Sequence, residues 1–169
     1  MRQGFNSSFD QLAKHLEKVR NEFIYNSITI NFKKMKTKIF LNLPVKDLQK
    51  SIDFFTQLGF SFNPQFTDEN ATCMIISEDI FVMLLVEKFF KTFTKKEIAD
   101  TSRTTEVIIA LSAESREKVD ELVDKAFVAG ATESNFTTDQ GFMYGRSFQD
   151  VDGHLWEVMW MDPSAVNQG

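Results

Sequence analysis

The chain has a single cysteine and only two histidines among its 169 residues. One cysteine excludes an internal disulfide bond and any zinc site built on a cysteine cluster. No run of about 18 apolar residues occurs, so no segment is predicted to span a membrane. The N-terminus also lacks the apolar core of a signal peptide. We therefore expect a cytoplasmic protein with no membrane partner.

Basic side chains are scarce beyond the first 34 residues. Residues 1–34 hold six basic and three acidic side chains, so residues 35–169 hold thirteen of the 19 basic and twenty-one of the 24 acidic ones. This body carries a net charge of −8 by the same count. Nucleic acid is an improbable partner, because neutralising phosphates requires a basic face.

Residues 1–34 also differ from the rest in pattern and predict an N-terminal helical extension. Ser8 with Gln11 is typical of a capping box at a helix start. Apolar side chains then recur every three or four residues, as along one side of a helix: Phe9, Leu12, Leu16, Val19 and Phe23. Two interpretations stay open. The extension lies upstream of a natural start at Met35, or it is an arm that docks on the body or on a second subunit.

Residues 35–87 predict a strand, a helix and three further strands. The first strand covers residues 38–43 and ends at Pro44, and the helix runs from its cap Asp47 to the closing Gly59. An apolar stripe marks the buried side of that helix: Leu48, Ile52, Phe55 and Leu58. Separated by turn residues, three strands follow over residues 60–66, 71–77 and 80–87.

Residues 105–162 repeat the same order. Ser115 caps the second helix and Gly130 closes it, 71 residues after Gly59. The strands are predicted over residues 105–112, 131–136, 141–148 and 154–161. The sequence thus predicts an α+β fold of two tandem βαβββ modules, with one face of each sheet covered by its helix. We expect the open faces to enclose a shared cavity, since pockets often lie where such units meet.

The segment between the modules, residues 88–104, is long for a connection. It is rich in lysine and threonine and contains three phenylalanines. Its length suggests a linker that serves as a lid or a subunit contact, although we favour the interpretation in which its phenylalanines pack on the sheet edges. Residues 163–169 form a short tail.

Two motifs at the ends of the duplicated region resemble one family. Val45-Lys46-Asp47-Leu48, followed by Ser51, Phe54-Phe55 and Leu58-Gly59-Phe60, is similar to the opening of the vicinal-oxygen-chelate superfamily. Residues 148–158, Phe-Gln-Asp-Val-Asp-Gly-His-Leu-Trp-Glu-Val, resemble its closing motif, with Val151 in place of the usual proline. The superfamily includes lactoylglutathione lyases, bleomycin- and fosfomycin-resistance proteins and extradiol dioxygenases. The resemblance covers residues 36–162 and implies a glyoxalase-like open barrel, a small-molecule ligand and a homodimer.

The resemblance also implies four metal-ligand positions, which fall on Phe40, Met83, Ile108 and Glu157. Only the last of these offers a donor atom that Zn²⁺, Ni²⁺ or Fe²⁺ would accept. We therefore predict no histidine-ligated metal. The alternative is a divalent ion such as Mg²⁺, Mn²⁺ or Zn²⁺, with Glu157 as its ligand and further oxygen donors from Asn42 and Glu106.

Glu157 is the predicted catalytic base or ligand-binding group; the alternative is a carboxylate paired with Arg146 or Arg103. His154 alternates to the opposite face of its strand. Tyr144 and Arg146 share a face and could hold an anionic ligand, unless they form a pair on the sheet surface. We also expect Trp156 or Trp160 to pack under a helix. The residues predicted to bind the ligand are Phe40, Asn42, Met83, Glu106, Ile108, Tyr144 and Arg146.

Three functions are consistent with these residues. The first is a glyoxalase-like enzyme that acts on a small polar metabolite. The second is a protein that sequesters a toxic or planar compound without changing it, as bleomycin-resistance proteins do. The third is a dimeric scaffold with a vestigial pocket. The sequence does not specify the ligand.

Overall fold

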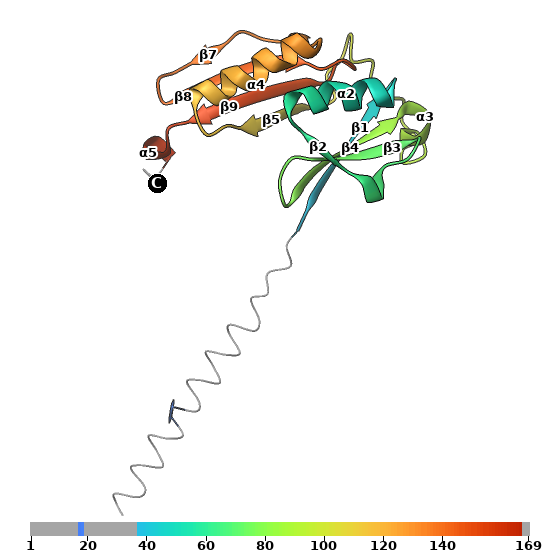
Figure 1. Ribbon diagram of the computed structural model, residues 1–169, viewed down its shortest axis with the longest axis horizontal. Helices are drawn as coiled ribbons and strands as arrows, with labels where there is room; N and C mark the ends of the chain where they lie inside the picture. The colour runs from blue at the N-terminus through green and yellow to red at the C-terminus, as the bar shows by residue number, and fades with distance from the viewer. Residues whose placement is uncertain (1–16, 19–36, 167–169) are drawn as a thin grey trace, which may run out of the picture. The chain divides into compact units, whose positions relative to one another are not determined.

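The computed structural model describes residues 17–18 and 37–166 (Figure 1). The chain divides into two units, Met1–Thr37 and Lys38–Gly169, and the fold described below is that of the second. The helix predicted over residues 9–23 lies outside the described residues, apart from exposed helical positions 17 and 18. Among the described residues, no helix combines the length and the apolar character needed to cross a membrane.

The first module is a four-stranded sheet with one helix on one face. Its strands are β1 (Ile39–Val45), β2 (Ser61–Asn63), β3 (Ala71–Ile75) and β4 (Ile80–Val86), in the order β1-β4-β3-β2. β1 runs parallel to β4, and helix α2 (Leu48–Leu58) follows β1 in the chain. The predicted caps are confirmed: Asp47 accepts the N–H of Lys50, and Gly59 ends the helix with φ of 100°.

Pro44 lies inside β1 and does not end it, which corrects the sequence prediction. The residue pairs in register with Leu85 of β4. A proline is tolerated in an edge strand such as β1, because its missing N–H can face away from the neighbouring strand. β2 is shorter than predicted because the 3₁₀ turn η1 (Pro64–Phe66) begins directly after it, capped by the side chain of Asn63.

The second module repeats this arrangement. Its strands are β5 (Ile108–Ser112), β6 (Thr132–Glu133), β7 (Thr138–Asp139), β8 (Met143–Gln149) and β9 (Leu155–Met161). The order is β5-β9-β8-β6, with β7 also paired to β8, and β5 runs parallel to β9. Helix α4 (Arg116–Ala129) begins after the predicted cap Ser115 and ends at Gly130, where φ is 108°. The predicted pair of βαβββ modules is confirmed.

The connection between the modules contains one short helix, α3 (Glu87–Phe90), which contacts β1 and β4. Phe89 and Phe93 pack edge to face with ring centroids 5.2 Å apart. Phe89 is partly buried, whereas Phe93 is exposed. The start of this segment therefore lies on the edge of the first sheet. A second short helix, α5 (Pro163–Val166), follows β9.

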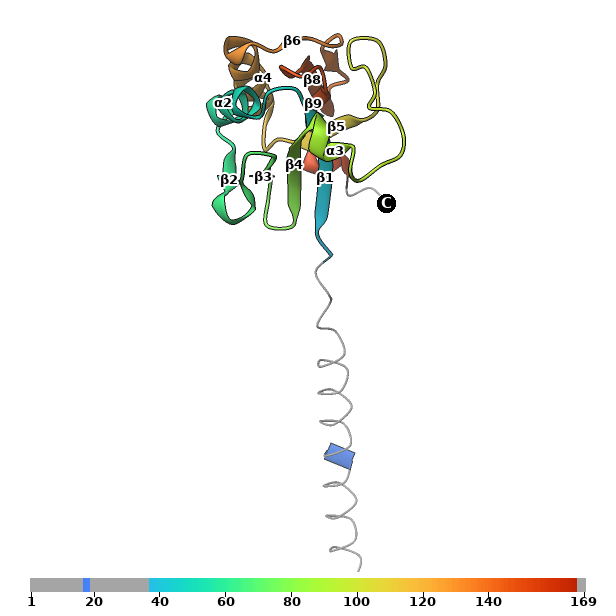
Figure 2. The same cartoon turned by 90° about the vertical axis from the view of Figure 1, so that its right-hand side faces the viewer.

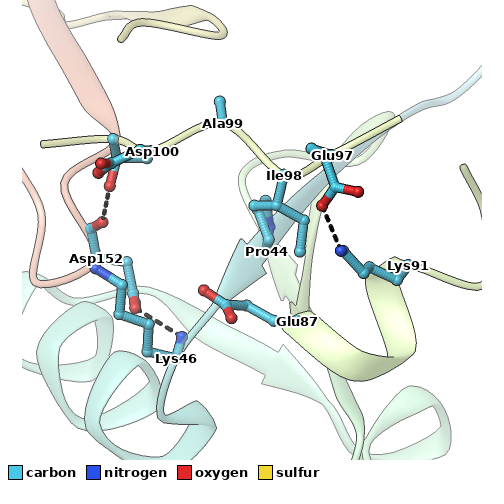
Figure 3. Close-up of a pocket in the computed structure, with 10 residues that line it drawn as sticks. Pro44, Lys46, Glu87, Lys91, Glu97, Ile98, Ala99, Asp100 and Asp152 are labelled. Atoms are coloured by element: carbon cyan, nitrogen blue, oxygen red, sulfur yellow. Dashed lines mark hydrogen bonds and ion pairs between the residues drawn. The ribbon is translucent and has the colours of Figure 1, made fainter. Parts of the chain in front are cut away.

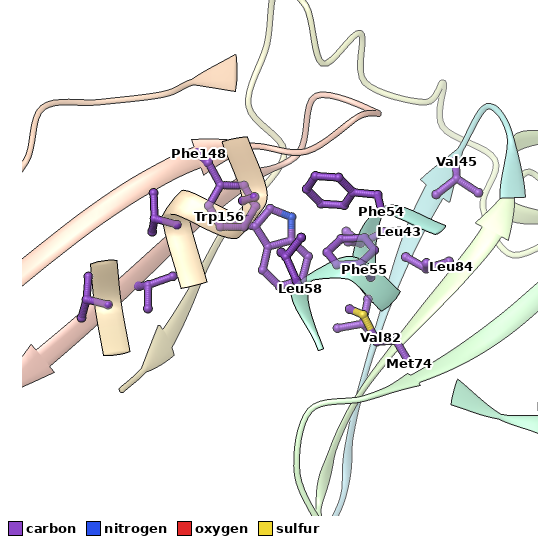
Figure 4. Close-up of a cluster of buried hydrophobic side chains, with 14 residues drawn as sticks. Leu43, Val45, Phe54, Phe55, Leu58, Met74, Val82, Leu84, Phe148 and Trp156 are labelled. Carbon is purple, nitrogen blue, oxygen red and sulfur yellow. The ribbon is translucent and has the colours of Figure 1, made fainter. Parts of the chain in front are cut away.

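One hydrophobic core serves both modules (Figure 4). Phe54 and Phe55 of α2 lie at its centre. Phe55 contacts Trp156 of β9 at 5.2 Å between ring centroids, and Phe54 contacts Phe148 of β8 at 6.2 Å. The remaining members come from the helix-facing sides of both sheets and from the two helices α2 and α4: Leu43, Val45, Leu58, Met74, Val82, Leu84, Val119, Val123, Ala126 and Val158.

The helices α2 and α4 pack against each other, and the helix-facing sides of both sheets join the same core (Figures 1 and 2). The two sheets remain separate and are not closed into a barrel. The other face of each sheet, here called its open face, is turned away from this core. The shared core therefore lies between the helix-facing sides of the sheets, and neither open face borders it.

Candidate functional site

Strand register places Glu157 on the open face of the second sheet. In the β8–β9 pair, Ser147 lies opposite Glu157 and Gly145 lies opposite Met159. Directly opposed residues point to the same side of a sheet, and neighbours along a strand point to opposite sides. Trp156 and Val158, the neighbours of Glu157, are fully buried in the shared core. Glu157 therefore points away from that core.

Glu157 borders a pocket of about 220 Å³ on this open face. The side chain is half-buried, and its carboxylate has no hydrogen-bond or ion-pair partner among the described residues. Further lining residues come from β7, β8 and β9 and from the loop before β7: Asn135, Phe136, Thr138, Met143, Gly145, Arg146, Ser147, Val158 and Met159. All of them belong to the second module. The pocket beside Glu157 is therefore formed by one module and is not the cavity that we expected both modules to share.

Tyr144 and Arg146 do share a face, as the sequence predicted, but the helix side rather than the open face. The Tyr144 hydroxyl donates to Asp120 of α4 at 2.8 Å. Arg146 donates to Asp120 at 2.8 Å and to Asp124 at 2.9 Å. These contacts match the alternative of a structural pair on the sheet. They also exclude Arg146 as the partner of Glu157.

The charges in this cluster stabilise one another. The hydrogen bonds from Arg146 and Tyr144 lower the pKa of Asp120, although burial opposes the shift. Burial and the bond to Asp120 both raise the pKa of Tyr144. The cluster therefore contains an ionised carboxylate, a neutral phenol and a guanidinium at neutral pH. Two carboxylates, those of Asp120 and Asp124, balance the guanidinium charge, so the cluster carries no net positive charge to attract an anionic ligand.

The two tryptophans behave as predicted. Trp156 is fully buried under α2 and donates its Nε1–H to Asp150 at 2.9 Å. Trp160 is half-buried on the α4 side of the sheet, where the guanidinium of Arg116 lies 5.3 Å from its ring centroid and 5.0 Å from that of Tyr144. Both rings therefore stabilise the helix–sheet contact.

The predicted site residues of the first module lie on its own open face. Asn42 pairs in register with Met83, and Phe40 pairs with Phe81, whose ring it stacks on at 5.0 Å. Phe40 is 53% exposed. None of these side chains lines the Glu157 pocket. Ile108 of β5 is also 53% exposed and lies outside it.

Glu106 is engaged elsewhere, which corrects its predicted role beside Glu157. Its Oε1 bonds Nδ1 of His154, whose ring is fully buried. The other ring nitrogen, Nε2, lies 2.8 Å from the carbonyl oxygen of Pro44. Since a carbonyl can only accept, Nε2 carries a hydrogen, and Nδ1 shares a proton with the carboxylate. His154 thus bridges the end of β1 and the segment before β5, on the side away from Glu157.

The environment of His154 favours its charged form. Burial alone would lower its pKa, but the charge of Asp150, the Pro44 carbonyl and the Glu106 carboxylate outweigh burial and raise it above the ordinary 6.5. Asp150 is buried too, and burial raises its pKa against the hydrogen bonds it accepts. Partners thus favour the charged form of His154, whereas burial favours the neutral form of Asp150.

The closing motif of the sequence joins the two modules. Asp150 Oδ1 accepts the backbone N–H groups of Asp152 and His154 at 2.9 and 3.0 Å. Asp152 in turn accepts the N–H of Lys46 at 2.8 Å and the hydroxyl of Ser51 at 2.6 Å. Both of these donors belong to the first module. The two aspartates are thus structural acceptors that hold the turn after β8 against the start of α2.

A larger pocket of about 330 Å³ lies away from Glu157, where the inter-module segment passes the end of β1 (Figure 3). Its lining is mostly charged. Lys91 and Glu97 pair at 2.5 Å across one end, and Asp152 is held by Lys46 N–H and by its carbonyl contact with Thr101 at the other. Another of its carboxylates, that of Glu87, is exposed to solvent. We therefore regard the smaller pocket, whose unpaired carboxylate is half-buried, as the candidate site.

The superfamily's metal does not fit the residues present. Phe40, Met83 and Ile108 supply no nitrogen or oxygen donor and do not border the pocket of Glu157. Among the described residues, no group of three or more histidine, cysteine, aspartate or glutamate side chains is arranged to hold an ion. The alternative set of Asn42, Glu106 and Glu157 fails as well, because Glu106 is bonded to His154.

Comparison with known proteins agrees with this architecture. A model of the bleomycin-resistance-protein-like N-terminal domain matches residues 37–77. The hypothetical protein SA1046 from S. aureus is 32% identical, with a TM-score of 0.64 over 78% of this chain and 98% of that chain. No curated protein matches the sequence significantly.

Two more distant structures share the fold. A glyoxalase-related enzyme from Fulvimarina pelagi is 16% identical, with a TM-score of 0.63 over 75% of this chain and 88% of its own. The fosfomycin resistance protein FosX from Mesorhizobium loti is 13% identical, with a TM-score of 0.55 over 76% and 94%.

Two βαβββ modules that pack around one shared core define the class of protein by its fold. This chain belongs to the vicinal-oxygen-chelate superfamily. Its acidic position is retained, whereas the positions of the other three ligands carry apolar side chains.

Sequence reasoning missed the neighbours of Glu157 in the pocket. Met159 could have been found by alternation along β9. Ser147, Gly145 and Met143 require the β8–β9 register, which depends on how many residues the intervening turn takes up. Phe136 lies in a loop and carries no signal in the sequence.

Proposed function

We propose that this protein binds a small organic molecule on the open face of its second sheet, beside Glu157, without a histidine-ligated metal. The observation that supports this proposal is a half-buried carboxylate that has no partner and borders a pocket of about 220 Å³. The charged side chains of Arg146 and His154, also in the second module, are by contrast paired. An unpaired group in a concave site is available to a ligand.

In the form we favour, the protein sequesters its ligand without transforming it. The bleomycin-resistance-like name of the matching N-terminal model supports this role. No histidine borders the pocket of Glu157. The donor set thus favours binding over metal-assisted chemistry.

A glyoxalase-like enzyme is the second candidate, and the same carboxylate favours it. A free carboxylate within reach of a bound substrate can remove a proton as a general base. Ser147, directly across from Glu157, has its hydroxyl within hydrogen-bond distance of the Asn135 backbone. In this mechanism Glu157 would move the proton and the Ser147 side of the pocket would orient the substrate.

We also propose that the protein is a cytoplasmic homodimer without a nucleic-acid partner. Exposed apolar side chains on the open faces support the dimer, among them Phe40 and Ile108. A second copy placed there would cover surface that one chain leaves open, and it could complete the pocket beside Glu157. The acidic body supports the absence of nucleic acid.

The test is whether a small molecule co-purifies with the full-length protein and depends on Glu157. Purified protein is denatured, and the released compounds are identified by mass spectrometry. We expect Glu157→Gln to lose the compound while its melting temperature changes by only a few degrees, about 1 kcal/mol or less. Glu133→Gln, which changes the same charge at an exposed position of β6, is the matched control and should retain it.

Three results would count against parts of this proposal. Unchanged ligand content in the Glu157 variant would show that the site lies elsewhere. Conversion of the isolated compound by the wild type, but not by the variant, would favour the enzyme over the sequestering protein. A stoichiometric divalent metal whose removal abolishes ligand binding would contradict a metal-free site.

A further inference from the structure

The pocket contains a negative charge that no positive charge in its lining balances. Glu157 is its only acidic lining residue, and Arg146 is its only basic one. The guanidinium of Arg146 is neutralised by Asp120 and Asp124, and its side chain points to the helix side of the sheet. No cation that borders the pocket is therefore free to pair with the Glu157 carboxylate. A bound ligand that brings a positive charge would provide the missing partner.

The rest of the lining is suited to an apolar body. Met143 and Met159 lie on the same open face, and thioether side chains adapt well to apolar surfaces. Phe136 stands 87% exposed at the pocket border, although aromatic rings of this size are usually buried in part. An aromatic face close to a carboxylate favours an organic cation, since the ring attracts positive charge and buries apolar surface.

Gly145 gives a second, independent indication. A glycine inside a strand costs about 0.5–1 kcal/mol in conformational entropy, and it often marks a site where a ligand approaches the backbone closely. Gly145 lies directly opposite Met159 and two residues from Ser147, the partner of Glu157. A Cβ built here would meet Val158 O at 3.6 Å and Met159 Cβ at 3.7 Å, which are ordinary contacts. The fold leaves enough space for a larger side chain here, so packing does not explain the glycine.

The donor set distinguishes an organic cation from a metal ion. A hard divalent ion takes six to eight oxygen ligands, roughly, with several carboxylates among them. The pocket has one carboxylate, and no group of three or more metal-binding side chains exists among the described residues. Its volume of about 220 Å³ is below the roughly 300–1,000 Å³ of drug-sized sites, so it suits a compact ligand group.

We infer that the ligand of this site is a compact organic cation, an amine or quaternary ammonium attached to an apolar or aromatic body. The positive group pairs with Glu157. The apolar body lies over Gly145 between Met143 and Met159, against Phe136. This inference rests on the proposed function, since it specifies the chemistry of the molecule that the same pocket binds.

The experiment compares two probes of the same shape and different charge. Benzylamine is cationic at pH 7 and benzyl alcohol is neutral. Each is titrated into the ¹⁵N-labelled full-length protein, and the backbone shifts of β8 and β9 are followed by NMR. We expect benzylamine to bind about tenfold more tightly, the factor that corresponds to about 1.4 kcal/mol from a partly screened charge pair.

Three variants identify the groups responsible. Glu157→Gln should remove the preference for the amine, whereas the matched control Glu133→Gln should keep it. Gly145→Ala should weaken both probes about threefold or more, because the new methyl group occupies the space over the strand. Its Cβ contacts are ordinary, so the variant should fold, and its amide spectrum verifies this.

The outcomes separate the inference from the proposed function. Equal binding of both probes, unaffected by Glu157→Gln but weakened by Gly145→Ala, would overturn the cationic ligand and leave the pocket in place. If neither Glu157→Gln nor Gly145→Ala changes the NMR shifts caused by the probes, the probes bind elsewhere. That result would overturn both the cationic ligand and the proposed function. Loss of amine binding in Glu133→Gln as well would reduce the preference to general electrostatics and would also overturn the inference.

Discussion

His154 connects three segments that are far apart in the sequence. Its imidazole donates to the Pro44 carbonyl and shares a proton with Glu106, and its backbone N–H is held by Asp150. The ring is 1% exposed, so no water can replace these partners directly. A buried polar bridge of this kind costs little when complete and much when one partner is removed.

We expect His154→Leu to lower the free energy of unfolding by about 2–4 kcal/mol, because the Pro44 carbonyl and the buried end of Glu106 lose their donor. Urea denaturation followed by tryptophan fluorescence measures the change. Glu106→Gln is the matched comparison and should cost less, since that side chain is 26% exposed and an amide oxygen can still accept from Nδ1. A loss below about 1 kcal/mol in the leucine variant would contradict the bridge.

The same residue predicts how stability depends on pH. The folded pKa of His154 lies above its ordinary value of 6.5, so the folded state binds this proton more tightly than the unfolded state. Its stabilisation is complete below pH 6.5 and is lost as the pH rises through the folded pKa. Asp150, whose pKa is also raised, acts in the same direction but at acidic pH.

Urea denaturation of the wild type and His154→Leu over pH 5 to 9 tests this dependence. The stability difference between the two proteins should be largest at the acidic end and shrink as the pH rises above about 6.5. A difference that grows with pH would mean that His154 is neutral in the folded protein and that Glu106 carries the shared proton.

At the scale of elements, the turn between β8 and β9 is fixed by the segment that joins the modules. Gly153 has φ of +90°, and a Cβ placed on it would lie 2.7 Å from the hydroxyl oxygen of Thr101. That hydroxyl donates to the carbonyl of Asp152 at 2.6 Å. Gly59, at the end of α2, has a similar φ of +100° with nothing within 4 Å of the corresponding Cβ.

The two glycines therefore form a matched pair. Gly59→Ala should cost about 1–2 kcal/mol of unfolding free energy from the left-handed backbone alone. Gly153→Ala should cost at least about 1 kcal/mol more, because the methyl group displaces Thr101. Thr101→Ala should partly rescue the second variant, and a double-mutant cycle measures that coupling. Equal costs for both glycines would mean that Thr101 does not hold the turn.

The elements themselves were largely predictable from the sequence, since their signals are local. Asp47, Ser115 and the two closing glycines delimit the helices as expected, because capping depends on a few neighbouring residues. The site was less predictable. For Tyr144 and Arg146 the sequence left open a ligand-binding pair or a structural pair. The cross-strand register decides between them, and that register is set by the turn and not by either strand.

Pairing between distant residues was also beyond the sequence. Glu106 stands two positions before Ile108, so alternation alone would place both on one face. The structure has no strand at Glu106, and its carboxylate meets His154 of the closing motif instead. Such a contact depends on how the two modules pack, which no local pattern records.

For the whole molecule we expect a homodimer. Light scattering after size exclusion should give twice the chain mass of 19.5 kDa at micromolar concentrations. Phe40→Glu places a charge on the open face of the first sheet, where the ring is 53% exposed, and should shift the protein toward the monomer without unfolding it. A monomeric wild type, or a dimer that the variant leaves unchanged, would contradict an interface on that face.

Since both sheets contribute to one interior, neither half of the gene encodes an autonomous polypeptide. A fragment ending before residue 88 would leave Phe54 and Phe55 without their contacts to Phe148 and Trp156. The complementary fragment would expose Phe148 and Trp156 to solvent for the same reason. The duplication has thus become obligatory. An isolated module would expose the apolar helix side of its sheet, so it would need a second module to cover that surface.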